Sequence, residues 1–168
     1  MGLVFSGENG LDLYRVSYNA VLKNLNSFVE RNKRIKPLNV TKYADDPQIV
    51  WYELYDDMIK APVAYVGINE NWKSLDGVDD VYAATLFAIS GKHYGMTLLK
   101  MVYGFYNNYP ERTAQRFSFT VDPDAKISLF VNYFKNLIDD YDGDDEPWDF
   151  EILETEWWKS VRFYKYFD

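Results

Sequence analysis

The chain has 168 residues, of which 48% are hydrophobic and 18% aromatic, and its net charge at pH 7 is −8. This much apolar and ring surface excludes a disordered chain and suits a single globular domain over residues 1–168. The lack of cysteine excludes disulfides and thiolate metal sites. No apolar run approaches the roughly 18 residues of a membrane helix, and the N-terminus lacks a secretory pattern, so we expect a cytoplasmic protein.

The first part of the chain predicts a short strand and then a long helix. Residues 2–6 form a short β-rich segment. Apolar residues at steps of three and four predict an amphipathic helix over residues 11–34, which ends before Pro37. The helix dipole favours cations at a helix end, so we interpret the basic cluster there as capping rather than phosphate-binding. The cluster comprises Arg31, Lys33, Arg34 and Lys36.

The middle of the chain predicts alternating helices and strands. Asp46 and Pro47 provide an N-cap and a first-turn proline, so we interpret residues 49–55 as a helix, although a strand also suits them. The remaining elements expected here are a strand over 62–69, a helix over 76–90, a helix over 96–107 and a strand over 115–121.

The last part of the chain predicts a helix followed by strands. Asp122 and Pro123 are a clear helix start, and an apolar face continues to Ile138. Apolar residues alternate again around 148–152 and 161–167, which indicates one or two strands, although a tryptophan-rich helix also suits this segment. The expected fold class is therefore α+β, with amphipathic helices packed on a small, mostly antiparallel sheet.

Charge is distributed unevenly along the chain. Residues 1–42 carry seven basic and three acidic side chains, whereas residues 43–168 carry eleven basic and twenty-three acidic ones. The first segment is therefore positive by 4 and the second negative by 12. An acidic surface disfavours nucleic-acid phosphates and anionic membranes, and it favours basic protein partners.

The densest acidic segment lies between residues 139 and 156, where ten acidic residues occur without a basic one. Tryptophans lie within and after it, and aromatic anchors beside steering charges are typical of protein-binding surfaces. The sequence alone therefore favours a non-enzymatic inhibitor of the immunity or anti-defence kind, which neutralises a nuclease toxin or another nucleic-acid-binding protein without a cofactor. A plainly solvated loop fits almost as well. The expected partner-binding residues are Asp139, Asp140, Asp142, Asp144, Asp145, Glu146, Trp148, Asp149, Glu151, Glu154 and Trp157.

One alternative is a calcium-binding module. Counted from Asp140, acidic side chains occupy positions 1, 3, 5 and 12 of a degenerate EF-hand-like loop. Asp145 stands where the loop needs glycine, and Pro147 removes an expected backbone donor. These departures make a metal site the weaker hypothesis.

A second alternative is a carboxylate-based hydrolase. Pairs such as Asp139 with Asp140, or Glu151 with Glu154, have the chemistry of a glycosidase, but the sequence does not fix their distance in space. His93 is the sole histidine, and we interpret it as a turn or C-terminal capping residue. No catalytic histidine pair or phosphate-binding glycine motif is present.

Overall fold

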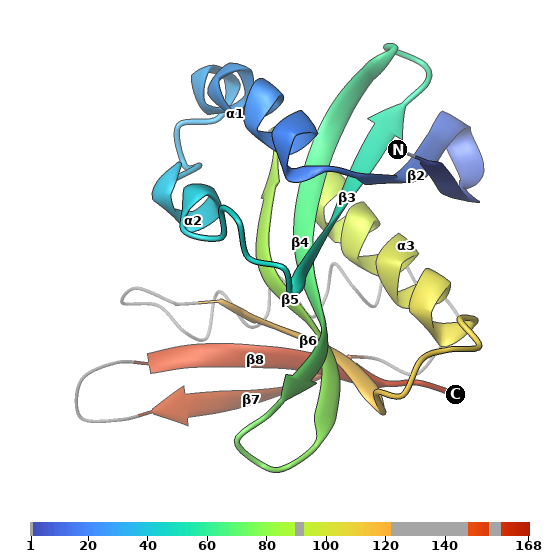
Figure 1. Ribbon diagram of the computed structural model, residues 1–168, viewed down its shortest axis with the longest axis vertical. Helices are drawn as coiled ribbons and strands as arrows, with labels where there is room; N and C mark the ends of the chain where they lie inside the picture. The colour runs from blue at the N-terminus through green and yellow to red at the C-terminus, as the bar shows by residue number, and fades with distance from the viewer. Residues whose placement is uncertain (1, 90–92, 122–147, 155–158) are drawn as a thin grey trace.

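A computed structural model describes residues 2–89, 93–121, 148–154 and 159–168, and its described strands form one eight-stranded sheet (Figure 1). The strand order is β1-β2-β3-β4-β5-β6-β8-β7, and β5 and β6 form the parallel pair while the other neighbours are antiparallel. The strands are β1 (Gly2–Ser6), β2 (Leu11–Val16), β3 (Ile49–Asp56), β4 (Ala61–Lys73), β5 (Asp79–Ala88), β6 (Arg116–Val121), β7 (Asp149–Glu154) and β8 (Lys159–Tyr166).

Helices cover both faces of this sheet. The short 3-10 helix η1 (Glu8–Gly10) joins β1 to β2. The helices α1 (Tyr18–Arg31) and α2 (Leu38–Thr41) lie over one face, and α3 (Tyr94–Asn107) lies over the other (Figure 1). None of the described helices is long and apolar enough to cross a membrane.

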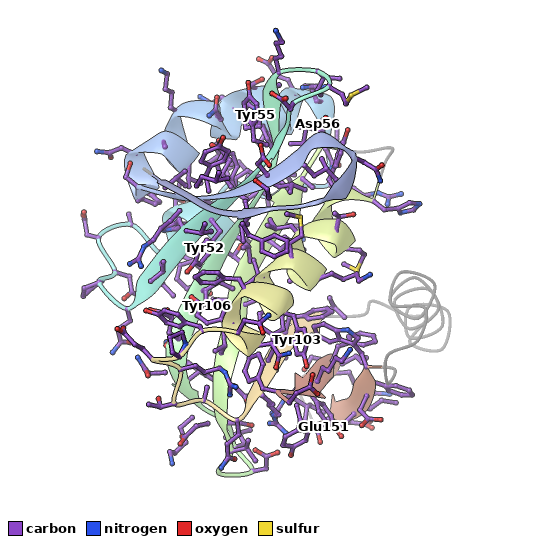
Figure 2. The ribbon with its side chains drawn as sticks, turned by 90° about the vertical axis from the view of Figure 1, so that its right-hand side faces the viewer. Tyr52, Tyr55, Asp56, Tyr103, Tyr106 and Glu151 are labelled. Atoms are coloured by element: carbon purple, nitrogen blue, oxygen red, sulfur yellow. The ribbon has the colours of Figure 1, made fainter. Side chains whose placement is uncertain are left out.

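Aromatic rings form the contacts between the helices and the sheet. On the α1 face, Phe28 packs on Phe87 and Tyr65, with ring centroids 5.5 Å and 5.4 Å away. On the α3 face, the rings of Tyr52 and Tyr106 lie edge to face, and their hydroxyls are 2.8 Å apart (Figure 2). Edge-to-face rings add to the free energy gained from burial alone, so both helices are held firmly against the strands.

The predicted fold class is wrong, because the chain builds a large sheet with few helices rather than helices on a small sheet. Three predicted helical regions contain strands: residues 11–16 form β2, residues 49–55 lie in β3, and most of residues 76–90 form β5. β3 and β5 are central strands with both faces covered, and such strands lack the alternation that distinguishes a strand from a helix.

Other predicted elements are confirmed. The strands at 2–6, 62–69 and 115–121 correspond to β1, β4 and β6, and the helix at 96–107 corresponds to α3. The C-terminal strands are β7 and β8. The helix predicted from Pro123 to Ile138 lies outside the described residues.

Candidate functional site

The parallel strands β5 and β6 stay together for only part of their length. Their register runs from Asp80, opposite Arg116, to Ala83, opposite Phe119. Beyond this point β5 continues beside β4, whereas β6 continues beside β8. Figure 1 shows β6, β8 and β7 running away from β4 and β5 at a steep angle. The sheet therefore opens between β5 and β6 beyond Ala83 and Phe119.

A β-bulge occurs in β5 where the strands part. Gly67 of β4 is opposite Thr85, and the next residue, Ile68, is opposite Ala83, so Ala84 is an extra residue in β5. A bulge removes backbone groups from the regular ladder and redirects the side chains that follow it. The hydroxyl of Tyr43 donates a hydrogen bond to the Ala84 carbonyl over 3.4 Å, so this tyrosine is tied to the bulge.

A cavity of about 720 Å³, here called the cleft, occupies the opening. Met96 and Leu99 of α3 line it from one face of the sheet, and Lys42 and Tyr43 line it from the other. The cleft therefore reaches the parted strands from both faces. Its described lining is Arg34, Lys36, Asn39, Lys42, Tyr43, Tyr82, Ala83, Ala84, Thr85, Leu86, Met96, Leu99, Phe119, Thr120 and Val121.

The cleft is basic and rich in hydroxyl groups. Among its described lining residues there are three cations and no Asp, Glu or His. Burial, followed by the negative charge of Asp46, raises the pKa of Tyr43. A tyrosine with a raised pKa keeps its proton at neutral pH, so Tyr43 can donate a proton but is poorly suited to accept one.

A smaller cavity of about 250 Å³, the helix-end hollow, adjoins the cleft at the start of α3. Arg34 and Lys36 line both spaces, and Gly95 of the first helical turn lines the hollow. A Cβ atom on Gly95 would lie 3.3 Å from a methyl group of Leu86, so glycine lets the helix start come close to β5. The first amides of an α-helix have no intrahelical acceptor, and the positive end of the dipole lies there. The hollow is therefore suited to an anion.

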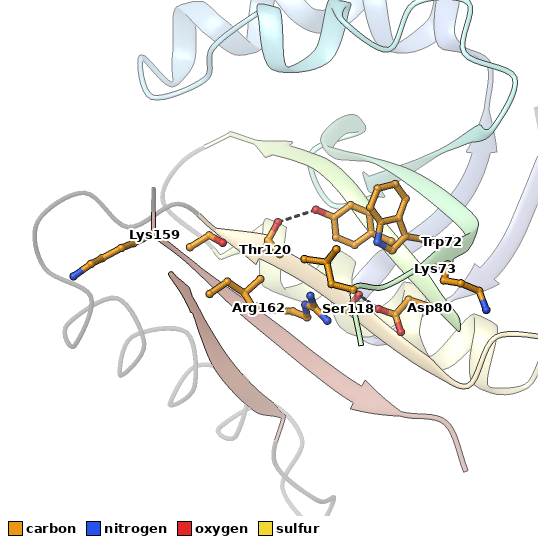
Figure 3. A pocket seen from close by; sticks show the side chains of 11 residues that line it. Trp72, Lys73, Asp80, Ser118, Thr120, Lys159 and Arg162 are labelled. Atoms are coloured by element: carbon orange, nitrogen blue, oxygen red, sulfur yellow. Dashed lines mark hydrogen bonds between the residues drawn. The ribbon is translucent and has the colours of Figure 1, made fainter. Parts of the chain in front are cut away.

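A third cavity of about 560 Å³, the side pocket, lies on the α1 face between the β4–β5 turn and the β7–β8 hairpin (Figure 3). The rings of Trp72 and Tyr82 stack with centroids 5.0 Å apart and form one wall. The Tyr82 and Thr120 hydroxyls are 2.7 Å apart, and both residues also line the cleft. The side pocket and the cleft are therefore adjacent spaces that share this hydrogen-bonded pair.

The floor of the side pocket is a buried network of charged and hydroxyl groups. Arg116 is 2% exposed and donates two hydrogen bonds to Asp80, which is 1% exposed, over 2.7 Å and 3.3 Å. The Ser118 hydroxyl donates to the same carboxylate over 2.7 Å. Arg162 donates to the Ser74 hydroxyl. Because these groups satisfy one another, we interpret the network as a structural support for the strands that shape the site.

The structure describes four of the eleven predicted partner-binding residues. Trp148 is buried at 1% exposure against Tyr103, Phe117 and Phe119, and so belongs to the core. Asp149, Glu151 and Glu154 lie in β7. The other seven lie outside the described residues: Asp139, Asp140, Asp142, Asp144, Asp145, Glu146 and Trp157.

Two acidic residues of β7 have basic partners within the chain. Glu151 pairs with Arg162 over 3.1 Å, and Glu154 pairs with Lys159 over 3.3 Å. Glu151 was also the last position of the calcium-loop hypothesis, and the earlier loop positions up to Pro147 lie outside the described residues. Within the described ranges, no group of three or more acidic or histidine side chains is placed to hold a metal ion. Partner binding by these residues stays a prediction.

Sequence reasoning missed most of the residues that line the cleft. The basic cluster at residues 31–36 was noticed, but Arg34 and Lys36 face cavities rather than serving only as helix caps. His93 is the N-cap residue of α3 and not a C-terminal cap. The bulge at Ala84 and the approach of Tyr43 depend on pairing between distant segments, and the sequence carries no local signal for them.

Neither family models nor curated proteins match the sequence, but solved structures match the fold. An alanine N-acetyltransferase for ribosomal protein S18 from Escherichia coli superposes with a TM-score of 0.58 and 9% identity, over 94% of each chain. A dodecameric spermidine N-acetyltransferase from Vibrio cholerae gives 0.54 and 11%, again over 94% of each chain. A GNAT-family acetyltransferase from Bacillus cereus gives 0.52 and 11%, over 93% of this chain and 96% of that one.

These likenesses show that the chain has the fold of GNAT acetyltransferases. They contradict the prediction of a non-enzymatic immunity or anti-defence inhibitor with a basic nuclease partner, because the proteins that share the fold are acetyl-transferring enzymes. The density of acidic residues along the chain does not reveal which strands surround a cavity, and this is the physical reason that the inhibitor prediction is wrong.

Proposed function

We propose that this protein is an N-acetyltransferase that moves an acetyl group from acetyl-CoA to an amine. The observation that carries the proposal is the cleft, which opens between parallel strands at a bulge and is lined from both faces of the sheet. Such an opening would let acetyl-CoA and the acceptor amine enter from opposite faces of the sheet and come together between the strands. The acetyltransferases with the same fold support this reaction class. We further propose that it acts in the cytoplasm, where its acetyl donor would be found.

The residues around the cleft fit the phosphates of acetyl-CoA. The start of α3 offers helix amides and the positive end of the helix dipole, which commonly bind phosphate groups. Arg34 and Lys36 line the adjoining hollow and would add charge-assisted hydrogen bonds. Gly95 keeps the first helical turn close to β5. The donor, when bound, would supply an activated thioester.

The chain's own groups suit acetyl transfer beside the bulge. The bulge takes backbone groups around Ala84 out of the regular ladder of hydrogen bonds. A backbone N–H group there is a candidate to stabilise the negative charge that develops on the acetyl carbonyl oxygen. Tyr43 is hydrogen-bonded to the Ala84 carbonyl, and its hydroxyl holds a proton that could protonate the thiolate leaving group. The neutral amine would lose one proton to water as its nitrogen bonds to the acetyl carbon. The sulfur would gain one from Tyr43 as the C–S bond breaks, and water would then return a proton to the tyrosine.

The proposal is tested by binding and by turnover. Titration calorimetry with acetyl-CoA should show saturable heat. Thiol release should then follow when an amine is added from a panel of spermidine, an aminoglycoside, and alanine- and lysine-containing peptides. Leu86→Trp should block both by filling the cleft, whereas Leu22→Trp, at an exposed position of α1, should not. Absence of heat with acetyl-CoA, together with absence of thiol release, would refute the proposal.

A further inference from the structure

Residues 31–42 form a basic segment in an acidic protein. They include Arg31, Lys33, Arg34, Lys36 and Lys42 and no acidic residue, although the whole chain has a net charge of −8. Three of these side chains line the cleft: Arg34, Lys36 and Lys42. The structure thus places positive charge at the cavity where the proposed reaction occurs.

No described lining residue of the cleft carries a negative charge, although Asp46 is close enough to Tyr43 to raise its pKa. Within the described parts of the chain, none of the three cleft cations forms an ion pair. A cavity lined by charges of one sign concentrates its field and attracts ligands of the opposite sign. A polyamine acceptor would still meet the charge of Lys42 when the phosphates of acetyl-CoA pair with Arg34 and Lys36, and it would find no carboxylate among these lining residues.

Lys42 is distinct from the other two cations. Arg34 and Lys36 also line the helix-end hollow, where the phosphates of acetyl-CoA would bind, whereas Lys42 lines the cleft but not the hollow. Its ammonium lies 5.2 Å from the ring centre of Tyr43, whose hydroxyl reaches the bulge. The charge of Lys42 is therefore next to the reacting groups and away from the hollow.

We infer that the acceptor is a primary amine whose molecule also carries a negatively charged carboxylate close to that amine, and that Lys42 recognises this carboxylate. Acidic peptides and amino acids belong to this class. The inference rests on the proposed acetyltransferase function and adds the charge of the substrate to it.

The test compares two peptides that differ in charge but hardly in shape. Both carry a lysine amine and blocked termini, with the sequences Gly-Asp-Lys-Asp-Gly and Gly-Asn-Lys-Asn-Gly. Spermidine serves as the cationic acceptor. We expect kcat/KM for the aspartate peptide to exceed that for the asparagine peptide by about fivefold to tenfold at low salt, and spermidine to be the poorest acceptor.

Two variants with the same change in net charge locate the effect. Lys42→Glu should remove the preference for the aspartate peptide and leave KM for acetyl-CoA within about twofold, because this lysine does not line the helix-end hollow. Lys33→Glu alters an exposed residue that lines neither cavity and should keep the preference.

Each other outcome overturns the inference. Equal or better turnover of the asparagine peptide or of spermidine would show that the cleft does not select negative acceptors. No turnover of the aspartate peptide by a protein that binds acetyl-CoA would also show that the cleft does not select negative acceptors. A raised KM for acetyl-CoA in Lys42→Glu, with the peptide preference intact, would assign this lysine to the donor. Failure to bind acetyl-CoA at all would instead refute the underlying acetyltransferase proposal.

Discussion

Tyr43 is the side chain in the cleft that is best suited to hold a proton for the reaction. Burial and the nearby Asp46 raise its pKa, and its hydroxyl is anchored on the Ala84 carbonyl. Tyr43→Phe should therefore lower kcat for acetyl transfer by about 100-fold, with little change in KM for acetyl-CoA. Steady-state kinetics check this, with the partly buried Tyr18→Phe, away from the cleft, as control. An unchanged kcat in Tyr43→Phe would exclude the hydroxyl from proton transfer.

Arg116 is the residue whose loss should most affect stability. Arg116→Met would leave Asp80 as a buried carboxylate without its cation, and such a break costs about 3–5 kcal/mol of unfolding free energy. Urea unfolding measures the loss. The control is Lys73→Ala, which removes an exposed ion pair with Asp79 and should cost less than about 1 kcal/mol. Similar losses of unfolding free energy for the two variants would mean that the buried Arg116–Asp80 pair stabilises the fold no more than an exposed ion pair.

Asp76 gives the protein a predictable response to acid. Burial acts to raise the pKa of its carboxyl, but hydrogen bonds from Ser74, the Val78 amide and Arg116, together with the charge of Arg116, lower it to about 2. Because the folded pKa lies below the unfolded value of about 3.9, this carboxylate stabilises the fold above about pH 4 and loses that effect as the pH falls toward 2.

The corresponding variant is Asp76→Asn. Its unfolding free energy should be lower than that of the wild type at pH 6, and the difference should shrink as the pH falls from about 4 to 2. Chemical unfolding monitored by circular dichroism at a series of pH values measures this. A difference that stays constant through that window would show that the Asp76 charge does not contribute to the acid response.

At the scale of elements, β5 shows why the central sheet could not be inferred from the sequence. Val78, Val81, Tyr82, Thr85 and Leu86 fit the spacing of a helix. Burial in β5 alternates, with Val81, Ala83, Thr85 and Phe87 buried. The half-buried residues between them include the large apolar Tyr82 and Leu86, so the sequence itself shows no clear period of two. The β-branched and aromatic residues of VYAATLF were the usable signal for a strand, and the periodicity outweighed it.

The boundary between β2 and α1 was predictable in principle. Ser17 caps α1 by accepting a hydrogen bond from the Ala20 amide, and serine is a preferred residue at that position. The apolar residues before and after Ser17 happen to follow the same helical spacing. For this reason the sequence pattern does not show that a strand ends and a helix begins there. The start of α1 places the basic segment 31–42 over the cleft, so this boundary is important for the site.

Two glycines allow a test of how tightly these elements pack. A Cβ atom on Gly67 in β4 would lie 3.0–3.1 Å from Ile49 and Trp51, so Gly67→Ala should destabilise the fold by about 1–3 kcal/mol. A Cβ atom on Gly104 in α3 meets nothing within 4 Å, and Gly104→Ala should stabilise by about 0.5–1 kcal/mol. Thermal and urea unfolding measure both. The same sign of change at both positions would contradict this view of the packing.

At the scale of the whole molecule, the unequal charge of the two segments was readable from the sequence, but its use was not. The acidic segment attracted the functional interpretation because it is the larger anomaly. The fold places the smaller, basic segment at the cleft. This segment starts at the end of α1 and ends just after α2, and both helices lie over the same face of the sheet (Figure 1). Local charge at a cavity and net charge therefore have opposite signs in this protein.

The contrast between the positive cleft and the negative net charge predicts how salt changes the rate at which acetyl-CoA binds. Acetyl-CoA is an anion, so a net charge of −8 alone would repel it, and added salt would then speed association. If Arg34 and Lys36 beside the helix-end hollow control its approach, salt should slow association instead, by about threefold to tenfold between 20 mM and 500 mM. Stopped-flow measurements distinguish these cases, and Arg34→Glu should reduce or reverse the slope while Lys33→Glu retains it. A rate that rises with salt in the wild type would show that the net charge, and not the basic segment, governs donor binding.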